Sequence, residues 1–500
     1  MPARIVMQTR DLREVARQVM LDQGFDPEFG PAVAAELKTL GKHPDTGAGP
    51  KDLRNLLWSS IDNDDTRDLD QIEFAAELGS GDSRLLIAIA DVDVEVPKGS
   101  AIDAHAAAQT TTVYTGVVVF PMIPVELSTG ATSLSEGADR KAVAVDMVVG
   151  SDGTVRSADV YRALVNNKAQ LTYGGVGSWL DSGGAIPEKV PKLPGLEAQL
   201  RLQARIATAL RKTRLDNGAL EIETVEARAV SHDGAVTSIE RSQRNSATDL
   251  IEDFMIAANG SVARFLEGHH VSGIRRIVRS PERWARIVDL ARELGTTLPP
   301  EPSAMALHDF MLARRKIDPD HFPDLSLAIV KLMGPGEYIL DQPGVVEPGH
   351  FGLAVQDYTH STAPNRRFAD LVTQRILKAV LASSSPPYTD DELSEIARNC
   401  TLKEDAARKV ERSVRKIAAA ILFSNRIGER FKAIVTGSKP NGTFVRLVGP
   451  PVEGMLVRGQ KGVDVGDEID VQLLSTNVKR GFIDFGKVGD TPLPNPPGKR

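Results

Sequence analysis

The sequence pattern changes at residue 431, and this change limits the possible folds more than any other feature of the chain. Residues 431–486 break into five short strand-like segments separated by turn signals: FKAIVTG, GTFVRLV, VEGMLV, GDEIDVQLLST and RGFIDFGKV. Five strands in fewer than 60 residues have the size and spacing of a small OB-fold barrel. The Pro-rich residues 487–500 that follow contain too few apolar side chains to form a core.

The preceding 430 residues combine strands and helices in an order that is typical of an α+β fold. Two segments predict β-hairpins that turn at Asp152-Gly153 and Asp233-Gly234, and residues 85–96 predict a strand. Apolar residues at helical spacing predict two helices within 9–41 and further helices over 194–213, 246–266, 281–295, 364–382 and 390–428. The hairpins argue against a doubly wound parallel sheet.

Composition narrows the class of protein. The chain has 500 residues, of which 41% are hydrophobic, and this is enough to bury a large core. Its one cysteine, Cys400, excludes an intramolecular disulfide or a Cys-rich zinc site, so a metal would need oxygen or nitrogen ligands. No apolar run approaches the roughly 18 residues that span a bilayer, and the N-terminus is charged where a signal peptide is apolar. We expect a cytoplasmic protein without membrane contact.

Charge is distributed unevenly along the chain. The net charge is -7, but residues 401–500 hold 18 Lys+Arg against 11 Asp+Glu, so this part has a net charge of +7 and the rest -14. A basic C-terminal fifth on an acidic body suggests that the tail and local basic patches bind a polyanion. An ordinary solvated helix face would explain the same bias equally well.

The densest group of ionisable residues is the acidic segment 60–73, SIDNDDTRDLDQIE. It holds six carboxylates in the twelve residues from Asp62 to Glu73, and these repel one another unless a cation lies among them. Mg²⁺ takes oxygen ligands and leaves positions for phosphate and water. The segment therefore predicts a site for a divalent cation, with an acidic surface loop as the alternative.

Two other motifs overlap this segment. The ligand positions 1, 3, 5, 7, 9 and 12 of an EF-hand loop match Asp62, Asp64, Thr66, Asp68, Asp70 and Glu73, but Arg67 stands where that loop needs glycine. The pattern Asp62-x-Asp64-x-Thr66 is that of the aspartyl nucleophile of haloacid-dehalogenase phosphatases. Such a phosphatase requires a doubly wound α/β body, which the hairpins make improbable.

A second group of functional residues spans 350–371, HFGLAVQDYTHSTAPNRRFADL. Pro364 suits a helix start, so Arg366 and Arg367 would lie near a helix N-terminus whose free N–H groups already attract anions. Guanidinium groups at that place are well suited to binding phosphate. In the alternative interpretation Arg366 and Asp370 form an exposed i,i+4 ion pair.

Together these segments resemble the ribonuclease II / ribonuclease R superfamily, the RNB-domain 3′-to-5′ exoribonucleases. Residues 60–72 are similar to the signature loop of that family, and residues 358–371 to its arginine motif. Other segments resemble the family in the same order: 88–92, Tyr114 with 120–124, 218–220, and 250–252 with 257–259. The resemblance covers residues 51–428, and residues 431–486 resemble the family's C-terminal OB-fold RNA-binding domain.

The resemblance implies a role for each matching residue. Asp62, Asp68 and Asp70 match carboxylates that hold Mg²⁺, with Mn²⁺ as an alternative ion, and that orient the attacking water. Arg366 matches the arginine that stabilises the transition state, and Arg367 matches a basic residue on the RNA backbone. Three further residues match positions that contact RNA: Tyr114, which would stack on the 3′-terminal base, Glu252, which would meet sugar hydroxyls, and Glu411.

The chain also departs from the family pattern. Gln71 replaces a second aspartate at the end of the acidic segment, so one metal ligand would be a neutral amide. Ala363, Asn365 and Phe368 replace the commoner Ser, Ile and Tyr. Only about 50 residues, predicted to be helical, precede the catalytic domain, too few for the two cold-shock OB-folds of well-known bacterial members.

We therefore predict an α+β RNB catalytic domain over 51–428 between a helical, helix-turn-helix-like region at 1–50 and an OB-fold at 431–486, with a tail at 487–500. The resemblance implies a processive, Mg²⁺-dependent exoribonuclease that releases nucleoside 5′-monophosphates. Its substrate would be single-stranded RNA 3′ ends and duplexes with a 3′ overhang, with DNA not expected as the main substrate. The alternative is a catalytically impaired RNB-fold protein with an RNA-binding or regulatory role.

Overall fold

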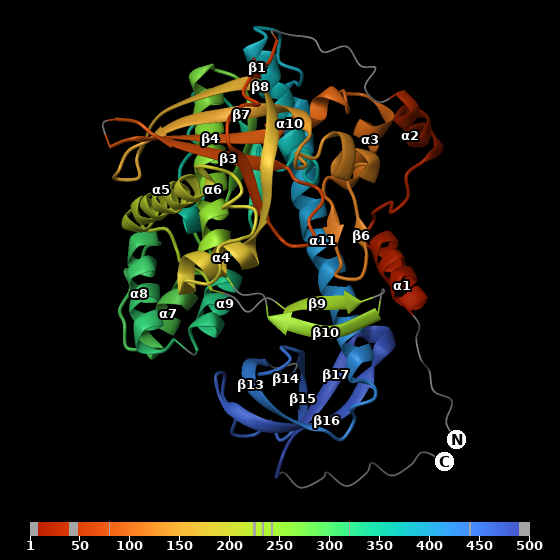
Figure 1. Ribbon diagram of the computed structural model, residues 1–500. Coiled ribbons are helices and arrows are strands. Elements are labelled where there is room, and N and C mark those ends of the chain that lie inside the picture. Colours follow the sequence, from red (N-terminus) through yellow and green to blue (C-terminus); the bar gives the residue numbers. More distant parts are fainter. Residues whose placement is uncertain are drawn as a thin grey trace.

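Figure 1 shows the computed structural model of the chain, which describes residues 9–39, 49–79, 81–223, 227–232, 235–241, 244–319, 321–439 and 442–489. The helices are α1 Thr9–Asp22, α2 Pro31–Glu36, α3 Ala101–Gln109, α4 Tyr173–Ser182, α5 Leu196–Asp216, α6 Ser246–Gly268, α7 Trp284–Glu293, α8 Ala304–Ile317, α9 Phe322–Met333, α10 Phe368–Leu381 and α11 Asp390–Phe423. The strands are β1 Lys51–Asp52, β2 Trp58–Asp62, β3 Gln71–Glu77, β4 Ser83–Ala90, β5 Val113–Tyr114, β6 Val119–Phe120, β7 Asp139–Val149, β8 Val155–Thr172, β9 Ala227–His232, β10 Ala235–Arg241, β11 Gly273–Ile277, β12 Glu337–Asp341, β13 Arg430–Lys439, β14 Gly442–Leu447, β15 Glu453–Arg458, β16 Glu468–Asn477 and β17 Phe482–Lys487.

The main sheet is strongly curved, with strand order β1-β8-β2-β3-β4-β7. The long strand β8 pairs with β7 over Val155–Asn166 and runs parallel to β2 over Asn167–Thr172. The middle strands are buried on both faces, so β4 reads as a continuous apolar run rather than an alternating one. Helices α6 and α10 bury their apolar sides in the same core. The acidic segment leaves this core at the end of β2 and returns to it at β3.

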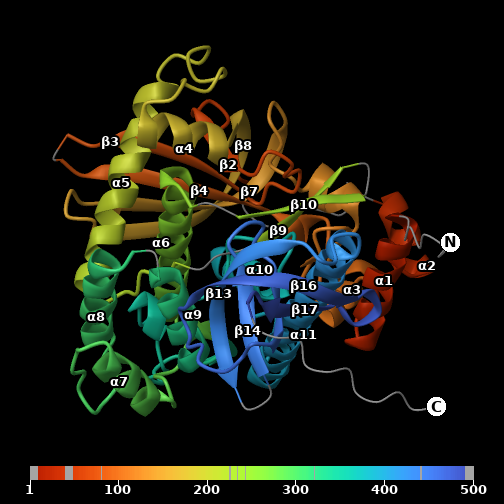
Figure 2. The ribbon, with the colours of Figure 1, turned by 90° about the horizontal axis from the view of Figure 1, so that it is seen from below.

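Helix α11 connects the main body to the C-terminal barrel. Its N-cap Thr389 forms a capping box with Glu392, and the helix then continues for 34 residues. The closed barrel β13-β14-β15-β17-β16 packs on the other end of α11, where Ala419, Ala420 and Phe423 join the barrel core. Seen from below, the barrel lies in front of α10 and α11 (Figure 2). These observations confirm the predicted α+β body and the five-stranded OB-fold.

Helix α1 packs on α11, whereas α2 packs on α3. The Glu36 carboxylate at the end of α2 accepts hydrogen bonds from the first N–H groups of α3, at Ala101 (2.6 Å) and Ile102 (3.1 Å). Two helices that lie on different neighbours differ from the paired helices of a helix-turn-helix unit.

Several predicted element boundaries were wrong. The predicted strand 85–96 ends at Ala90, because the buried Asp91 carboxylate turns toward Lys378, whose Nζ lies 2.8 Å away. The helix predicted from Pro364 begins at Phe368, and the one predicted to reach residue 428 ends at Phe423. The sequence analysis did not predict α3, α4, α8 and α9. The turn predicted at Asp233-Gly234 lies outside the described residues, although the two strands beside it pair as a hairpin.

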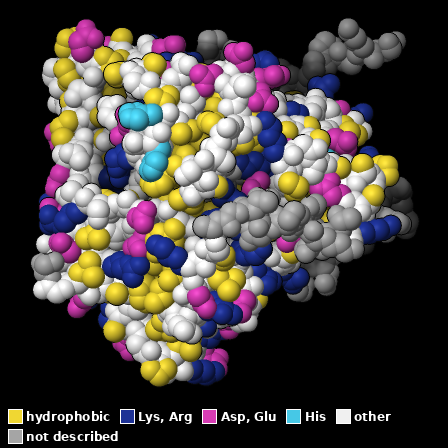
Figure 3. Space-filling view, turned by 90° about the horizontal axis from the view of Figure 1, so that it is seen from above, with side chains coloured by type: hydrophobic (Ala, Val, Ile, Leu, Met, Phe, Trp, Pro, Cys, Tyr) yellow, Lys and Arg dark blue, Asp and Glu magenta, His cyan; other side chains and the backbone are white. Residues whose placement is uncertain are grey.

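Acidic and basic side chains are interspersed with apolar ones over the face shown in Figure 3. Opposite charges next to each other cancel at a distance, so this face does not produce a strong field of one sign. Among the described residues, the helices are too short or too polar to cross a membrane.

Candidate active site

The acidic loop, residues 62–70, joins β2 to β3 and is held at both ends by backbone pairing. Ser59 of β2 is directly opposite Glu73 of β3, and the Asp70 carbonyl accepts a hydrogen bond from Ala90 N (2.9 Å). In the loop, Leu69 N donates to Ser133 Oγ (3.1 Å). These contacts place the end of the loop in the core while Asp64 and Asp65 remain exposed.

Asp70 meets Arg366, a residue almost 300 positions later in the chain. Arg366 Nε donates to Asp70 Oδ2 (3.2 Å), and Asn365 N donates to Asp70 Oδ1 (2.9 Å). The Asp70 side chain is 2% exposed, whereas that of Arg366 is 45% exposed. Burial raises the pKa of the Asp70 carboxyl to about 7, while Arg366 and the Asn365 N–H group favour its ionised form. One buried carboxylate therefore faces one accessible guanidinium.

Asp68 contacts the aromatic ring that the sequence analysis selected. Tyr114, in the β5–β6 hairpin, donates a hydrogen bond from its hydroxyl to Asp68 Oδ2 (3.0 Å). The N–H of Tyr114 donates to Glu411 Oε1 on α11 (3.2 Å). The structure thus brings Asp68, Asp70, Tyr114, Arg366 and Glu411 together from four separate parts of the chain.

Asp62 lies at the end of β2 on the same loop. Its Oδ1 accepts hydrogen bonds from the Thr66 hydroxyl (2.9 Å) and from Asn63 N (2.7 Å). Burial raises the pKa of Asp62, although both hydrogen bonds and Arg366 oppose the shift. Thr172 of β8 pairs with Asp62, so Tyr173 at the start of α4 follows directly after a partner of the acidic loop. Burial, Asp62 and Glu73 raise the pKa of Tyr173. Sequence analysis missed Tyr173 because no local pattern relates it to the loop.

Gln71 is the first residue of β3 and pairs with Ile89 of β4. Its side chain is 6% exposed. An amide at this position is neutral, so the site carries one carboxylate fewer than the family pattern. Gln71 directly follows Asp70, at the point where the acidic loop enters β3.

The acidic loop offers the donors that a hard divalent cation prefers, but not in a closed cage. Among the described residues, no three His, Cys, Asp or Glu side chains are arranged to hold a metal ion by themselves. Asp62, Asp68 and Asp70 are each held by a protein donor instead. Burial raises the pKa of Asp62 and of Asp70; Asp68 adds to both rises, and Arg366 opposes them. Mg²⁺ completes its shell with water and phosphate, so these residues fit an ion that arrives with a phosphate group.

Arg367 and Asp370 form an ion pair that corrects one expectation. The alternative interpretation paired Asp370 with Arg366, but Asp370 Oδ1 lies 2.7 Å from Arg367 Nη2. The Asp370 side chain is fully buried, and its Oδ1 also accepts a hydrogen bond from Ala363 N (2.8 Å). Asp370 therefore fixes the turn before α10, and Arg366 is left to face Asp70. Arg367 is 27% exposed, so it remains accessible to a ligand.

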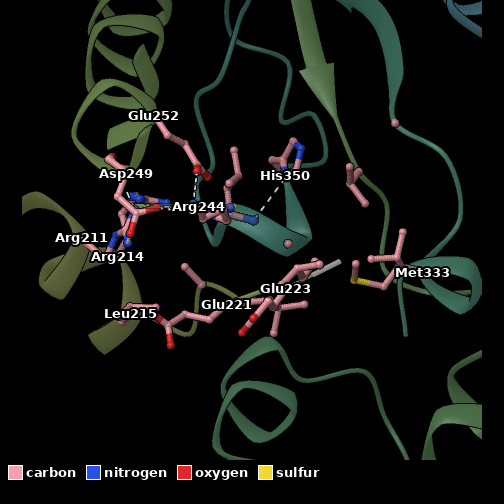
Figure 4. Close-up of a pocket in the computed structure, with 18 of the residues that line it drawn as sticks. Arg211, Arg214, Leu215, Glu221, Glu223, Arg244, Asp249, Glu252, Met333 and His350 are labelled. Atoms are coloured by element: carbon pink, nitrogen blue, oxygen red, sulfur yellow. Dashed lines mark hydrogen bonds and ion pairs between the residues drawn. The ribbon is translucent and has the colours of Figure 1, made fainter. Parts of the chain in front are cut away.

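A cavity of about 720 Å³ lies between α5, α6, α9 and α11. Glu252 lines it, and so do Arg211, Arg214, Arg244, Arg276, Arg315 and Arg408. Figure 4 shows Arg244 between Asp249 and Glu252, and it forms ion pairs with both. The acidic loop is not among the described residues that line this cavity, so Glu252 lies apart from the carboxylates of the loop.

The cavity is linked to the acidic loop through Asn245 and Tyr173. Asn245, which caps α6 and lines the cavity, donates from Nδ2 to the Tyr173 carbonyl (3.0 Å). Burial raises the pKa of Glu411, and Arg415 and Arg408 oppose the rise. Arg408, which lines the cavity, and Glu411, which accepts the hydrogen bond from Tyr114 N, are three residues apart on α11.

These groups together suit the handling of a phosphodiester. The acidic loop can hold a cation, Arg366 can stabilise charge on a phosphoryl group, and Tyr114 offers an aromatic face that is 41% exposed. Each of the six arginines of the cavity forms an ion pair with an acidic side chain.

Comparison with known sequence families agrees with this geometry. Residues 50–383 match the family described as the RNB domain, and residues 429–488 match the RNase II-type exonuclease C-terminal S1 domain. Ribonuclease R of Escherichia coli (strain K12) is 29% identical over 492 residues, which cover 90% of this chain and 59% of the relative. Ribonuclease R of Thermotoga maritima is 30% identical over 469 residues, which cover 87% of this chain and 64% of the relative. The chain thus spans about 60% of the length of these curated relatives.

Solved structures share the fold. Mycoplasma genitalium RNase R in complex with double-stranded RNA is similar with a TM-score of 0.84 and 22% identity, over 96% of this chain and 83% of that one. The structure of yeast Ssd1, a pseudonuclease, is similar with a TM-score of 0.69 and 17% identity, over 90% of this chain and 56% of that one.

Proposed function

The chain belongs to the RNB-domain family, the ribonuclease II / ribonuclease R superfamily, and from this membership we propose that it is a metal-dependent exoribonuclease. It would hydrolyse RNA processively from the 3′ end and release nucleoside 5′-monophosphates. The observation that carries the proposal is the contact between Asp70 and Arg366. A buried carboxylate beside an accessible guanidinium, with two further aspartates on the same loop, is a suitable arrangement for hydrolysis of a phosphodiester.

Each residue of the site has a role in this proposal. Asp62, Asp68 and Asp70, together with Gln71, would hold Mg²⁺ or Mn²⁺, which supplies positive charge beside the scissile phosphate. Asp70 orients the attacking water. Arg366, whose side chain is 45% exposed, donates to the phosphoryl oxygens as negative charge develops on them.

Tyr114 and the cavity would bind the 3′ segment of the RNA. The Tyr114 ring stacks on the terminal base, which requires no particular sequence because every base has an aromatic face. The preceding nucleotides follow the wall of α11 into the cavity, where the arginines meet phosphates and Glu252 meets a ribose hydroxyl. Arg367 adds a further contact to the backbone, and Glu411 orients the Tyr114 hairpin through its bond to the Tyr114 N–H group.

The domain division follows from the same proposal. We assign catalysis to residues 51–428 and additional RNA binding to the barrel, residues 431–486, which lies at the far end of α11. A cytoplasmic location, expected from the single cysteine, suits an enzyme that acts on cellular RNA.

A second candidate function is RNA binding without cleavage. Two observations favour it: Gln71 replaces an acidic ligand, and a protein described as a pseudonuclease shares the fold. Asp62, Asp68, Asp70 and Arg366 are all retained, which favours the enzyme.

A gel assay on RNA labelled at its 5′ end separates the two functions. With Mg²⁺, the enzyme shortens the labelled strand to a small end product, and chromatography of the released material shows nucleoside 5′-monophosphates. RNA joined into a circle has no 3′ end and should stay intact. Bound but uncut linear RNA would instead identify an RNA-binding protein.

A further inference from the structure

The N-terminal helix contributes to a small apolar core that is separate from the main one. Leu12, Ala16 and Met20 form a stripe on α1 at intervals of four residues, and Phe25 follows the helix. Met20 is 1% exposed and Ala16 is fully buried. The stripe packs on the part of α11 that holds Ala407, Val410, Val414 and Ile417. Figure 1 shows α1 beside α11 and β6.

The third member of this core is the hairpin that carries Tyr114. Val113 and Val117 are buried in the same cluster as the α1 stripe. The hairpin pairs only two residues of each strand, Val113 with Phe120 and Tyr114 with Val119. A two-stranded hairpin of this length is not stable alone, so its position depends on what packs against it.

The two faces of the hairpin contact different parts of the protein. Val113 points into the small core, and Tyr114, the next residue, is 41% exposed toward Asp68. The α1 side of the hairpin thus supports the strand from which the Tyr114 ring reaches the acidic loop. Val113 thus shares one apolar cluster with α1 and α11, and the next residue, Tyr114, donates to Asp68.

The end of α1 is attached to α11 independently of the apolar stripe. Lys403 of α11 donates from Nζ to the carbonyl of Gly24, and its Nζ lies 4.5 Å from the centre of the Phe25 ring. Arg17 and Glu28 form an ion pair (2.9 Å) across the turn that follows the helix. The Lys403 contacts therefore attach the end of α1 to α11, and the ion pair holds the turn against α1.

We propose that α1 positions Tyr114, so that Met20 and its neighbours act as positioning residues for the 3′-terminal base of the RNA. The inference rests on the proposed function, because it assumes that Tyr114 stacks on this base. In this view α1 supports the substrate-binding surface and does not itself contact RNA.

The test is a double-mutant cycle between Met20→Ala and Tyr114→Ala. Affinity for a single-stranded RNA is measured in an Asp70→Asn background, so that cleavage does not interfere. Tyr114→Ala should weaken binding by about 5- to 150-fold, as expected for the loss of one base–aromatic stack. Met20→Ala should also weaken binding, by a smaller factor than Tyr114→Ala does. The double variant should bind no more weakly than Tyr114→Ala alone.

A substrate change provides a readout that a general loss of stability would not produce. RNA whose 3′-terminal nucleotide lacks its base cannot stack, so Met20→Ala should have no effect on its binding. Met20→Leu, which keeps an apolar side chain of similar size, should bind ordinary RNA with wild-type affinity. Leu21→Ala, on the same helix but 41% exposed, is the matched control and should bind normally. If Met20→Ala does not fold, Leu12→Ala, at the other end of the stripe, takes its place in the cycle.

The outcomes separate this inference from the proposed function. Additive losses in the cycle, or an equal loss on RNA without the terminal base, overturn the role of α1 even if the wild-type protein degrades RNA. A wild-type protein that binds RNA without degrading it contradicts the proposed activity, while the cycle still decides how α1 acts.

Discussion

The hydroxyl of Tyr114 donates a hydrogen bond to Asp68, with 3.0 Å between Oη and Oδ2. The residue proposed to stack on the terminal base therefore touches a carboxylate proposed to bind the cation. Base binding and cation binding are thus adjacent in space, and a change in the position of the ring would affect both.

Replacing Tyr114 by phenylalanine separates the ring from its hydroxyl. Tyr114→Phe should keep RNA affinity within about twofold, because stacking depends on the aromatic face. Tyr114→Ala should lose about 1 to 3 kcal/mol of binding free energy. Equilibrium binding to a fluorescent single-stranded RNA, in the Asp70→Asn background, measures both. Equal losses in the two variants would assign the binding energy to the hydroxyl instead.

Asp70→Asn should abolish cleavage and leave RNA affinity almost intact. The carboxylate is proposed to hold the cation and water, whereas affinity comes from phosphate contacts and stacking along the whole strand. Cleavage of labelled RNA and equilibrium binding are measured in parallel, and chelation of the metal by EDTA should mimic the variant. Glu197→Gln, which changes an exposed carboxylate on α5 outside the loop, is the control. Loss of affinity as large as the loss of rate would indicate that the loop is structural.

Arg366→Ala should lower the rate of the chemical step about 10²- to 10³-fold, the usual cost of removing a donor that stabilises transition-state charge. Single-turnover cleavage at saturating enzyme measures this step apart from binding. The dissociation constant should change far less. Arg366→Lys retains the charge without the forked geometry and should recover only part of the rate. A dissociation constant raised as much as the rate is lowered would make Arg366 a binding residue.

Gln71→Asp should lower the Mg²⁺ concentration required for half-maximal activity. If the Gln71 amide stands where a carboxylate ligand would be, the added negative charge strengthens the hold on the cation. A metal titration of activity at constant ionic strength compares the two proteins. Gln71→Ala, which removes the amide oxygen and leaves the charge of the site unchanged, is the matched variant and should need more metal than wild type. An unchanged or higher midpoint for Gln71→Asp would exclude Gln71 as a ligand and direct attention to Asp64 or Asp65.

A duplex with a short 3′ overhang should be degraded, while a blunt duplex resists. The overhang supplies an unpaired 3′ end on which Tyr114 can stack, whereas the terminal bases of a blunt duplex are already paired. Each stacked base contributes about 1 to 3 kcal/mol, which is comparable to the cost of opening one base-pair step. A labelled duplex series with graded overhangs measures where degradation stops. Stalling several nucleotides before the junction on every substrate would show that only single strands enter.

Local periodicity predicted the elements whose own residues determine them. The five strands of the barrel, the hairpin at Asp152-Gly153 and helices such as α5, α6 and α11 follow from apolar spacing and turn residues within each segment. Residues whose structure depends on distant partners were predicted less well. The helix expected from Pro364 starts at Phe368, because Phe368 N donates to the Thr110 carbonyl (2.8 Å) and Asn365 N to Asp70. Because these partners lie far away in the chain, the start of this helix cannot be predicted from the sequence of the segment itself.

By itself, the sequence determined the chemical inventory of the site: an acidic loop, two adjacent arginines and one aromatic residue, in an order that resembles a known family. Tertiary structure decided which of these groups meet. It paired Asp70 with Arg366 rather than leaving that arginine to Asp370, and it brought Tyr114 to Asp68 and Glu411. The physical reason is that periodicity reports only which face of a segment is buried. Contacts between residues almost 300 positions apart depend on how the curved sheet, α10 and α11 pack together.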